Sequence, residues 1–542
     1  MDELKTELQT RKNTSAAGPS DIGYAMLKHL PDILTATLGK LFYICWKTSL
    51  VPMQWKWTSL YPIPKPKDWN YNIGITRPIL LIECTRKWMM KILTSRLSTC
   101  LQEHNILRGP NFAALKGEST SSPIALLNCA IEDAREKNNE LWIVCQDMAK
   151  AFDSVGLTPL KFALQCIKLP PNIIEFIIHI FKERKIKIIT TYGLSNGFTA
   201  EDGIDQGEII SPLLWRIFYD PLLCRIQSNP NYGYTMHWHN NTILRPIRIA
   251  CSAFADDTIW VGASREQTQA IIETSNSFFA LNDIEINGNK SELLVINGKQ
   301  PIDRLKVIMG KNKDVVTCAG LNTPVRFLGV WLSRKKGSRH TINICAHYIK
   351  DTVSTLKPKA ITLAHAVYIV NTVIIPKVLY MLQSTELTSS TANTLQSPLN
   401  VITKIKGNFP ITMDSSALHH QALVGLNILS HKHLENSASI FVDLISKNTV
   451  TCRTLLNRIC LWQLIHGLTI PPFDVDLDIT SLGHTNSNNW AIYILRELRL
   501  IDISIMLPNN LNVFYNSISI SPTINSVARN NRPASGNLNI NR

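Results

Sequence analysis

The chain has 542 residues, 45% of them apolar, and carries 56 Lys and Arg against 41 Asp and Glu, a net charge of +15 at pH 7. Its length exceeds that of one compact unit, and its apolar content excludes a largely disordered chain. The charge favours a polyanionic partner, and nucleic acid fits better than an anionic membrane, because we find no basic amphipathic anchor. Twelve scattered cysteines without a C-x-x-C motif argue against a disulfide framework and favour reduced, intracellular thiols.

No segment of the sequence is predicted to address the chain to a membrane. The N-terminus, "MDELKTELQTRKN", is polar and acidic, unlike a signal peptide. The longest apolar stretch, "NIIEFIIHIF" (172–181), is too short to span a bilayer and contains Glu175 and His179. We therefore expect an intracellular protein without a membrane partner.

The first 110 residues are expected to alternate short helices with extended segments. The run "YPIPKPK" (61–67) cannot be helical, because its prolines remove backbone donors and hold their neighbours extended. The run "RKWMMKILTSRL" (86–97) repeats apolar residues at helical spacing. Its basic face either meets solvent or contacts nucleic acid. The cations available for that face are Arg86, Lys87, Lys91 and Arg96.

A strand, a helix and a second strand are predicted next. "LWIVCQ" (141–146) is a short apolar strand that ends at Asp147. The apolar stretch 172–181 is typical of a buried helix, and "KERKIKIITTYG" (182–193) of a basic strand. The chain thus returns to extended structure soon after the helix.

The run "SPLLWRIFYDPLLCRI" (211–226) is expected to form a helix. Ser211 is its predicted N-cap, and Pro212 suits the first turn, where a missing N–H does no harm. Pro221 is predicted to end or kink this helix, because proline removes a backbone hydrogen bond.

Residues 246–263 are predicted to form two strands joined by a tight turn that carries Asp256 and Asp257. "VRFLGVWLS" (325–333) is a further strand signal, and the pattern from 341 to 450 is helical. The tail is rich in Asn, Ser and Ile and is expected to be disordered.

Adjacent carboxylates at 256 and 257 have two interpretations. They are either the polar tip of a hairpin or the ligands of a cation, since two neighbouring carboxylates repel one another. If the strands that end at Asp147 and Asp256 are neighbours in one sheet, three carboxylates meet at one edge. Such a group suits Mg²⁺, which takes oxygen ligands and leaves positions for substrate phosphates. Two such ions would serve a phosphoryl displacement, and a basic nucleotidyl transferase is the predicted class.

Three motifs carry a family resemblance: "QDMAKAFDSV" (146–155), "GIDQGEIISPLLW" (203–215) and "AFADDTIW" (253–260). In this order they resemble the central palm motifs of reverse transcriptases of the non-LTR retrotransposon (LINE-like) type. The flanking segments "WKWTSLYPIPKP", "NFAALKGESTSSPI" and "IIPKVLYML" resemble parts of the fingers and thumb, so that the likeness covers roughly residues 15 to 385.

The resemblance implies an α+β fold of the right-hand polymerase kind, with fingers, a palm built on an antiparallel sheet, and a helical thumb. The expected divisions are the lead-in and fingers (1–140), the palm with part of the fingers inserted (141–335), the thumb (336–450), a helical extension of unknown role (451–506) and a disordered tail (507–542).

The resemblance also implies residue roles. Asp147, Asp256 and Asp257 would be the catalytic metal ligands, for two Mg²⁺ with Mn²⁺ as the alternative ion. The other residues would bind the deoxynucleoside triphosphate. Phe152 would exclude a 2′-hydroxyl as a steric gate, although it could also be an ordinary core residue. The remaining residues would contact the triphosphate, the template or the leaving pyrophosphate: Lys65, Arg77, Gln206, Gly207 and Lys290.

The activity implied is RNA-directed DNA synthesis from a DNA primer on an RNA template, in the nucleus for a retrotransposon protein. An RNA-templated RNA polymerase and a catalytically inactive RNA-binding descendant are the alternatives. Two residues depart from the pattern: Glu208 adds a negative charge near the template, and Trp215 replaces a commoner phenylalanine, a mild change. We recognise no endonuclease, so the chain resembles a polymerase core, either truncated or encoded as a separate open reading frame.

Overall fold

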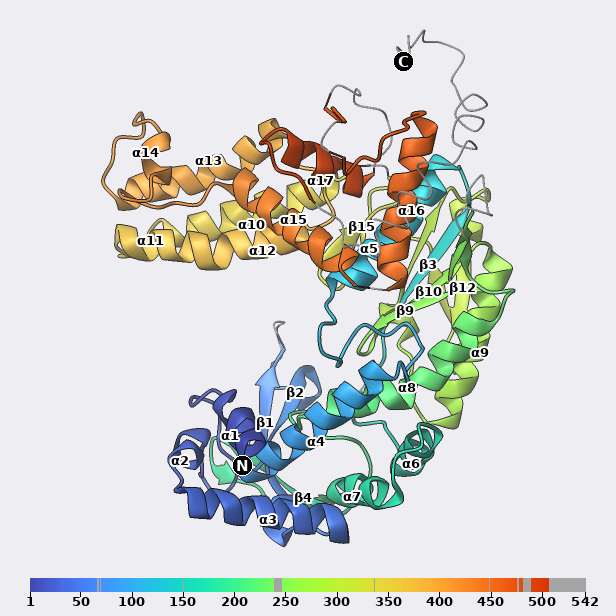
Figure 1. Ribbon diagram of the computed structural model, residues 1–542, viewed down its shortest axis with the longest axis vertical. Helices are drawn as coiled ribbons and strands as arrows, with labels where there is room; N and C mark the ends of the chain where they lie inside the picture. The colour runs from blue at the N-terminus through green and yellow to red at the C-terminus, as the bar shows by residue number, and fades with distance from the viewer. Residues whose placement is uncertain are drawn as a thin grey trace.

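The computed structural model describes residues 1–505 apart from 66, 67, 69, 150, 238–245, 336, 448, 475, 476 and 481–488. Its elements form an arc (Figure 1), with the N-terminal helices and a small sheet in the lower arm, a larger sheet in the middle and a helical upper arm. These three parts correspond to the expected fingers, palm and thumb of an α+β right-hand polymerase. The tail predicted to be disordered, 507–542, lies outside the described residues.

The fingers are built on a small mixed sheet. Its strand order is β2-β1-β4-β5, with β6 also on β4; β1 runs antiparallel to β2 and parallel to β4. Pro62 and Pro64 lie in the part of β1 that no longer pairs with β4, where a missing N–H breaks no bond to that neighbour. The elements of the fingers are α1 (Asp2–Gln9), α2 (Tyr24–Lys28), α3 (Asp32–Thr48), η1 (Met53–Lys56), β1 (Trp57–Pro64), η2 (Ile73–Ile75), β2 (Thr76–Leu81), α4 (Cys84–Glu103), α6 (Leu157–Cys166), α7 (Pro171–Phe181), β4 (Arg184–Thr190), β5 (Gly193–Leu194) and β6 (Phe198–Ala200).

The N-terminal helix α1 lies along the basic helix α4. Arg96 forms an ion pair with Glu3 at 2.5 Å, and Lys91 lies 3.8 Å from Glu7. Arg86, expected on the same basic face, is completely buried. The acidic side chains of α1 therefore neutralise part of the face that the sequence offered to solvent or nucleic acid.

The palm is built on a four-stranded antiparallel sheet of order β11-β3-β10-β9. Trp142 and Val144 of the central strand β3 pack in one apolar cluster with α8 and α9, while Leu141 and Ile143 pack in a second one with α5. Burial on both faces explains why "LWIVCQ" is apolar throughout. The palm elements are α5 (Ser121–Glu136), β3 (Leu141–Gln146), α8 (Ser211–Ser228), β7 (Tyr234–Met236), β8 (Ile247–Ile249), β9 (Cys251–Phe254), β10 (Asp257–Gly262), α9 (Arg265–Leu281), η3 (Gly288–Lys290), β11 (Glu292–Ile296), η4 (Ile302–Arg304), β12 (Lys306–Met309), β13 (Asp314–Thr317), β14 (Val325–Phe327) and β15 (Val330–Leu332).

Helix α8 confirms the helix predicted at 211–226 but differs in two details. Its N-cap position is Ile210, and Ser211 is already helical, with a buried hydroxyl group that no described group bonds. Pro221 does not end the helix, which continues to Ser228. Because α8 is buried around most of its circumference, side-chain packing offsets the backbone hydrogen bond that the proline removes.

The thumb is helical, as predicted for residues 341–450. Its stretch Leu363–Met381 is long and apolar enough to cross a membrane by length and composition, and is longer than the stretch 172–181 that the sequence analysis singled out. Its buried side chains, among them Val370, Ile374 and Val378, pack in an apolar cluster with α10 and α13. The thumb elements are α10 (Arg339–Leu356), α11 (Leu363–Ile369), the π-helical turn η5 (Val370–Ile374), α12 (Ile375–Met381), α13 (Ser389–Lys406), α14 (Ser416–His419) and α15 (Leu429–Ile445).

The two C-terminal helices, α16 (Val450–Ile465) and α17 (Trp490–Arg499), pack against the palm, where α16 lies beside α5 (Figure 1). Arg458 of α16 is buried and binds Glu136 of α5 at 2.6 Å and Glu132 at 3.3 Å. Helices α16 and α17, which lie in the segment without an expected role, therefore cover one face of the palm. All twelve cysteines are free, as the sequence predicted.

Candidate active site

The paired carboxylates lie at a two-residue turn, Asp256 in the turn and Asp257 at the start of β10. Strands β9 and β10 are antiparallel, with Phe254 opposite Asp257, so that Ala255 and Asp256 form the connection. Ala255 has a φ of 56°, in the left-handed region that residues other than glycine seldom adopt. Backbone strain of this kind is concentrated at functional sites. The carboxylate pair thus does lie at the tip of a hairpin, one of the two interpretations of the sequence. This position also leaves it free to bind a cation, the other interpretation.

The sheet register brings Asp147 to this turn. In β3 and β10 the last paired residues are Gln146 and Thr258, and the next position along places Asp147 opposite Asp257. Residues directly opposite on antiparallel strands lie on the same face of the sheet. The backbone of Asp147 is fixed as well, because its N–H donates to the Ser291 hydroxyl oxygen (3.1 Å) and its carbonyl accepts from Asn287 N–H (3.0 Å). The predicted convergence of the two strand ends is confirmed.

The carboxyl groups at the turn repel one another. Removal from water, followed by the charges of Asp256 and Asp147, raises the pKa of Asp257 to about 6, and Arg326 offsets this in part. The pKa of Asp256 is also raised, first by burial and then by Asp147. Both side chains still keep an exposed surface, which leaves them accessible to a ligand.

The three carboxylates fit a hard cation in their chemistry. All their donors are oxygen atoms at one sheet edge, and in the described part of the chain no ion pair involves them. Within the same residues, no group of three or more His, Cys, Asp or Glu side chains is placed so that it could hold a metal ion. The strand register places the three carboxylates near one another, and their charges interact. The side chains are not yet arranged as a complete set of metal ligands.

Two side chains that the sequence analysis did not place in the site hold the turn. Trp215 of α8 donates its indole N–H to the carbonyl oxygen of Ala255 at 2.9 Å. Asn111 accepts from the Ala255 N–H (3.3 Å) and donates to the same carbonyl (3.4 Å). In the sequence, Trp215 stands out only as a mild departure from the family pattern.

Phe152 lies five residues after Asp147 and is half-buried. Its ring packs on that of Trp215, with 5.8 Å between centroids. Its carbonyl accepts a hydrogen bond from Ile204 N–H (3.0 Å), which docks the second motif on the segment after β3. Phe152 is therefore neither a fully buried core residue nor a free surface residue.

Gln206 and Gly207 lie where this second motif meets the fingers. The carbonyl of Gln206 accepts from Leu80 N–H of β2 at 2.9 Å, and its side chain lies 3.4 Å from the carboxylate of Asp153. Gly207 has a φ of 124°, and a Cβ there would meet the Leu80 oxygen at 2.6 Å. Only glycine fits this close approach.

Lys65 and Arg77 are exposed on the β1–β2 hairpin of the lower arm (Figure 1). Arg77 pairs with Ile63, two residues before Lys65, and Lys65 N–H donates to the Ile75 carbonyl at 3.0 Å. Because side chains alternate along a strand, Lys65 and Arg77 share one face of this sheet. They therefore form a cationic pair on the fingers, apart from the carboxylates.

The same face of the sheet continues onto β4. Trp57 pairs with Lys185, and the ammonium groups of Lys185 and Lys187 each lie 5.2 Å from the centre of the Trp57 ring. The two cation–π contacts hold both lysines beside the ring. Positive charge next to an aromatic side chain is the combination found on surfaces that bind single-stranded nucleic acid.

Lys290 lies in the short turn η3 after α9. Its N–H donates to the carbonyl of Asn287 (3.2 Å), the residue whose N–H binds the carbonyl of Asp147. Its side chain is exposed. The backbone thus places Lys290 in the segment that is bonded to Asp147 at the end of β3.

Glu208 was expected to add a negative charge near the template, and this expectation is wrong. Its side chain is buried and accepts from Arg86 Nε at 2.7 Å. Arg86 also binds Asp205 at 3.1 Å, and Arg184 forms a further ion pair with Asp205. The charge of Glu208 is matched inside the protein by this network.

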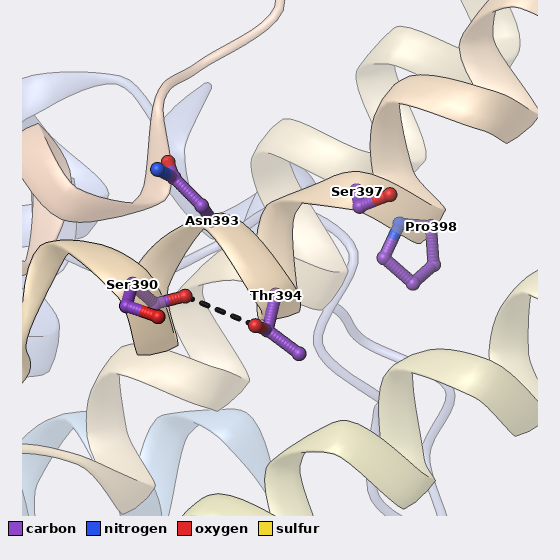
Figure 2. Close-up of a pocket in the computed structure, with 5 residues that line it drawn as sticks. All are labelled: Ser390, Asn393, Thr394, Ser397 and Pro398. Atoms are coloured by element: carbon purple, nitrogen blue, oxygen red, sulfur yellow. Dashed lines mark hydrogen bonds between the residues drawn. The ribbon is translucent and has the colours of Figure 1, made fainter.

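A shallow depression of about 820 Å³ lies on α13 of the thumb. Figure 2 shows its lining side chains, with the Thr394 hydroxyl bonded to the Ser390 carbonyl at 3.0 Å. The lining residues are Ser390, Asn393, Thr394, Ser397 and Pro398. None of them is a titratable acid or base, and this depression offers no chemistry comparable to that of the carboxylates.

Comparisons with known proteins show which family the chain resembles. Residues 63–332 match the family described as reverse transcriptase (RNA-dependent DNA polymerase). The Pol polyprotein of the type-1 retrotransposable element R2 of Popillia japonica is 25% identical over 340 residues, which cover 62% of this chain and 45% of that protein. Its counterpart in Nasonia vitripennis is 24% identical over 362 residues, covering 66% and 33%.

Two further proteins are similar. A probable RNA-directed DNA polymerase from transposon BS of Drosophila melanogaster is 24% identical over 227 residues, covering 41% of this chain and 25% of that one. A telomerase structure from Candida tropicalis with a fragment of telomeric RNA covers 80% of this chain and 68% of its own at 11% identity, with a TM-score of 0.35. The chain spans less than half the length of the R2 proteins above.

Proposed function

Because residues 63–332 form a reverse transcriptase domain of the non-LTR retrotransposon type, we propose that this chain synthesises DNA on an RNA template. One observation carries the proposal: Asp147, Asp256 and Asp257 meet at one edge of the palm sheet, with the pKa values of the last two raised. A carboxylate at the edge of a sheet that has no cationic partner is a candidate ligand for a metal ion.

In the proposed reaction the 3′-hydroxyl of a DNA primer attacks the α-phosphate of a deoxynucleoside triphosphate. A new phosphodiester bond forms, the bond to the β-phosphate breaks, pyrophosphate leaves, and the hydroxyl proton is released. When bound, two Mg²⁺, or Mn²⁺ in their place, supply the Lewis acidity that lowers the pKa of the attacking hydroxyl and stabilises the leaving oxygen. Asp147 and Asp256 would be the principal ligands, with Asp257 the third.

The remaining residues would bind and select the nucleotide. Lys65 and Arg77 on the fingers would bind the triphosphate, since an arginine fork suits phosphate oxygens. Phe152, held against Trp215, would close the space beside the sugar 2′-carbon. Gln206 and Gly207 would contact template and nucleotide, and Lys290, in the segment bonded to Asp147, would donate a proton to pyrophosphate.

We further propose that the palm, fingers and thumb follow the divisions 1–140, 141–335 and 336–450, and that 451–506 supports the palm. The partners are then an RNA template and a DNA primer, bound in part by the cationic face that includes Lys185 and Lys187. Use of a genomic primer would place the protein in the nucleus.

Primer extension by the purified chain tests the proposal. An RNA template with an annealed DNA primer, Mg²⁺ and the four deoxynucleoside triphosphates should yield extended DNA. Preference for ribonucleotides would favour an RNA polymerase, and RNA binding without extension would favour an inactive descendant. Either result contradicts the proposed function.

A further inference from the structure

Trp215 links three parts of the site. Its side chain is completely buried in α8, and its indole N–H donates to the carbonyl of Ala255 at 2.9 Å. One neighbour of its ring is Phe152 at 5.8 Å, and another is Tyr219, stacked at 5.3 Å. The Tyr219 hydroxyl in turn lies 3.1 Å from that of Thr258 in β10. The ring is thus fixed by the strand that follows the turn it holds.

The bond to Ala255 acts on Asp256 through one rigid group. A peptide unit is planar, so fixing the carbonyl of Ala255 also fixes the N–H of Asp256. That plane also contains the Cα of Asp256, from which the carboxylate side chain extends. The indole N–H therefore sets the plane from which the Asp256 carboxylate takes its orientation, at a residue whose φ of 56° is strained.

A phenylalanine would preserve only part of this arrangement. It could still pack on Phe152 and Tyr219, but it has no N–H for the Ala255 carbonyl. The Asn111 side-chain amide would remain as the only other described donor to that oxygen, at the longer distance of 3.4 Å. The turn would then remain folded but be held less firmly.

We propose that Trp215 is a positioning residue with two separable roles: its N–H orients Asp256 for metal binding, and its ring supports Phe152 beside the nucleotide sugar. This inference rests on the proposed function and deepens it. It concerns a residue that touches neither substrate nor metal and acts through the turn and through Phe152.

The test compares Trp215→Phe with Trp142→Phe. Trp142 is also buried (1% exposed) and lies at the other end of β3. Its indole N–H donates to Glu140 at 2.8 Å, so that its replacement by phenylalanine likewise removes one hydrogen bond. Both variants remove the same atoms from the core. Melting temperature reports the structural effect, which the two are expected to share.

Two measurements on the protein without nucleic acid address the turn. Amide hydrogen exchange at 255–257 should become faster in Trp215→Phe and stay unchanged in Trp142→Phe. Mn²⁺ binding, followed by electron paramagnetic resonance, should weaken in Trp215→Phe alone. Wild-type exchange and Mn²⁺ affinity in Trp215→Phe would overturn the proposal, whether or not the wild-type chain extends a primer. Absence of extension by the wild type would contradict the proposed function only.

Primer extension separates the two roles. In Trp215→Phe, kcat should fall by about 10- to 100-fold, because small displacements of reacting groups cost about that much, while KM for dGTP and the preference for dGTP over GTP stay near wild type. Trp215→Leu, which also removes the aromatic support of Phe152, should lower that preference. A wild-type kcat in Trp215→Phe, or the same preference in a folded Trp215→Leu, would overturn the corresponding role.

Discussion

Asp205 and Glu208 are buried beside arginines, whereas Asp147, Asp256 and Asp257 stand at a sheet edge with no ion-pair partner among the described residues. Both groups lie close to the second motif, and both contain residues whose pKa is raised: burial raises that of Glu208, and burial with mutual repulsion raises that of Asp257 to about 6. A raised pKa alone therefore does not identify the active site.

The difference lies in what balances the negative charge. Arg86 contacts both buried acids and also donates to the Trp55 carbonyl at 2.7 Å, so this network joins α4, the second motif and η1 as a structural element. At the edge carboxylates, the charge of Arg326 lowers the pKa of Asp257 but does not offset burial and the two neighbouring carboxylates. Their charge can be balanced by a ligand from outside, which is what a catalytic site needs.

The largest effect is expected at the edge carboxylates. Asp147→Ala or Asp256→Ala should lower primer extension by about 10³-fold or more, since each removes a charge that the transition state depends on. Melting temperature and RNA binding should stay close to wild type, because removing one carboxylate relieves repulsion. Extension at the normal rate with RNA binding lost would contradict the assignment.

The buried network should respond in the opposite way. Arg86→Ala removes the arginine that pairs with the buried Glu208 and one of the two arginines that pair with Asp205. It should lower the free energy of unfolding by about 3–5 kcal/mol. Arg96→Ala is the matched control, because its ion pair with Glu3 is more than half exposed on the arginine side (58%) and should contribute at most about 1 kcal/mol. Urea denaturation measures both. Similar losses in the two variants would remove the distinction between the groups.

Phe152 tests whether the residue beside the edge carboxylates selects the substrate. Phe152→Val should admit ribonucleotides, because overpacking of about 1–3 kcal/mol corresponds to a preference of roughly 5- to 150-fold. The measurement is the ratio of incorporation efficiencies for dGTP and GTP. The efficiency for dGTP itself should fall less than this ratio does. An unchanged ratio in an active variant would make Phe152 a packing residue only.

The smallest effect concerns pH. The pKa of Asp257 in the folded, metal-free protein is about 6, above the usual value of 3.8, so its contribution to stability is present below pH 3.8 and is lost as the pH rises through 6. Asp257→Asn should therefore stabilise the metal-free protein more at pH 7.5 than at pH 4, by less than about 1 kcal/mol because the group is solvent-screened. Thermal unfolding at both values of pH measures this. An equal stabilisation at pH 4 and pH 7.5 would show that repulsion between these carboxylates does not affect the stability of the fold.

The active-site strands were predictable because their signals are local. "LWIVCQ" is apolar over six residues and ends at Asp147, and the carboxylate pair interrupts the next apolar run. Each pattern is costly unless a sheet buries the strand on both faces and the acids lie at its edge. The helices at 172–181 and 211–226 likewise follow from apolar content and a proline in the first turn.

The sequence does not show which charged residues form ion pairs. Glu208 lies 122 residues from Arg86, and nothing near either residue indicates that they neutralise one another. The same holds for α1, whose acids bind the basic helix α4 across the fingers. The basic residues of α4 and the carboxylate of Glu208 were expected to face solvent or nucleic acid, because composition does not reveal the partner that packing supplies.

The sequence by itself predicted the candidate metal ligands Asp147, Asp256 and Asp257, because each lies where an apolar run ends. The tertiary structure decided that Asp147 faces Asp257, since only strand register selects the opposite residue. It also decided the role of Trp215, whose N–H meets the Ala255 carbonyl from a helix forty residues away. Local patterns specify elements and reactive groups, whereas hydrogen bonds and ion pairs between distant segments depend on how those elements pack.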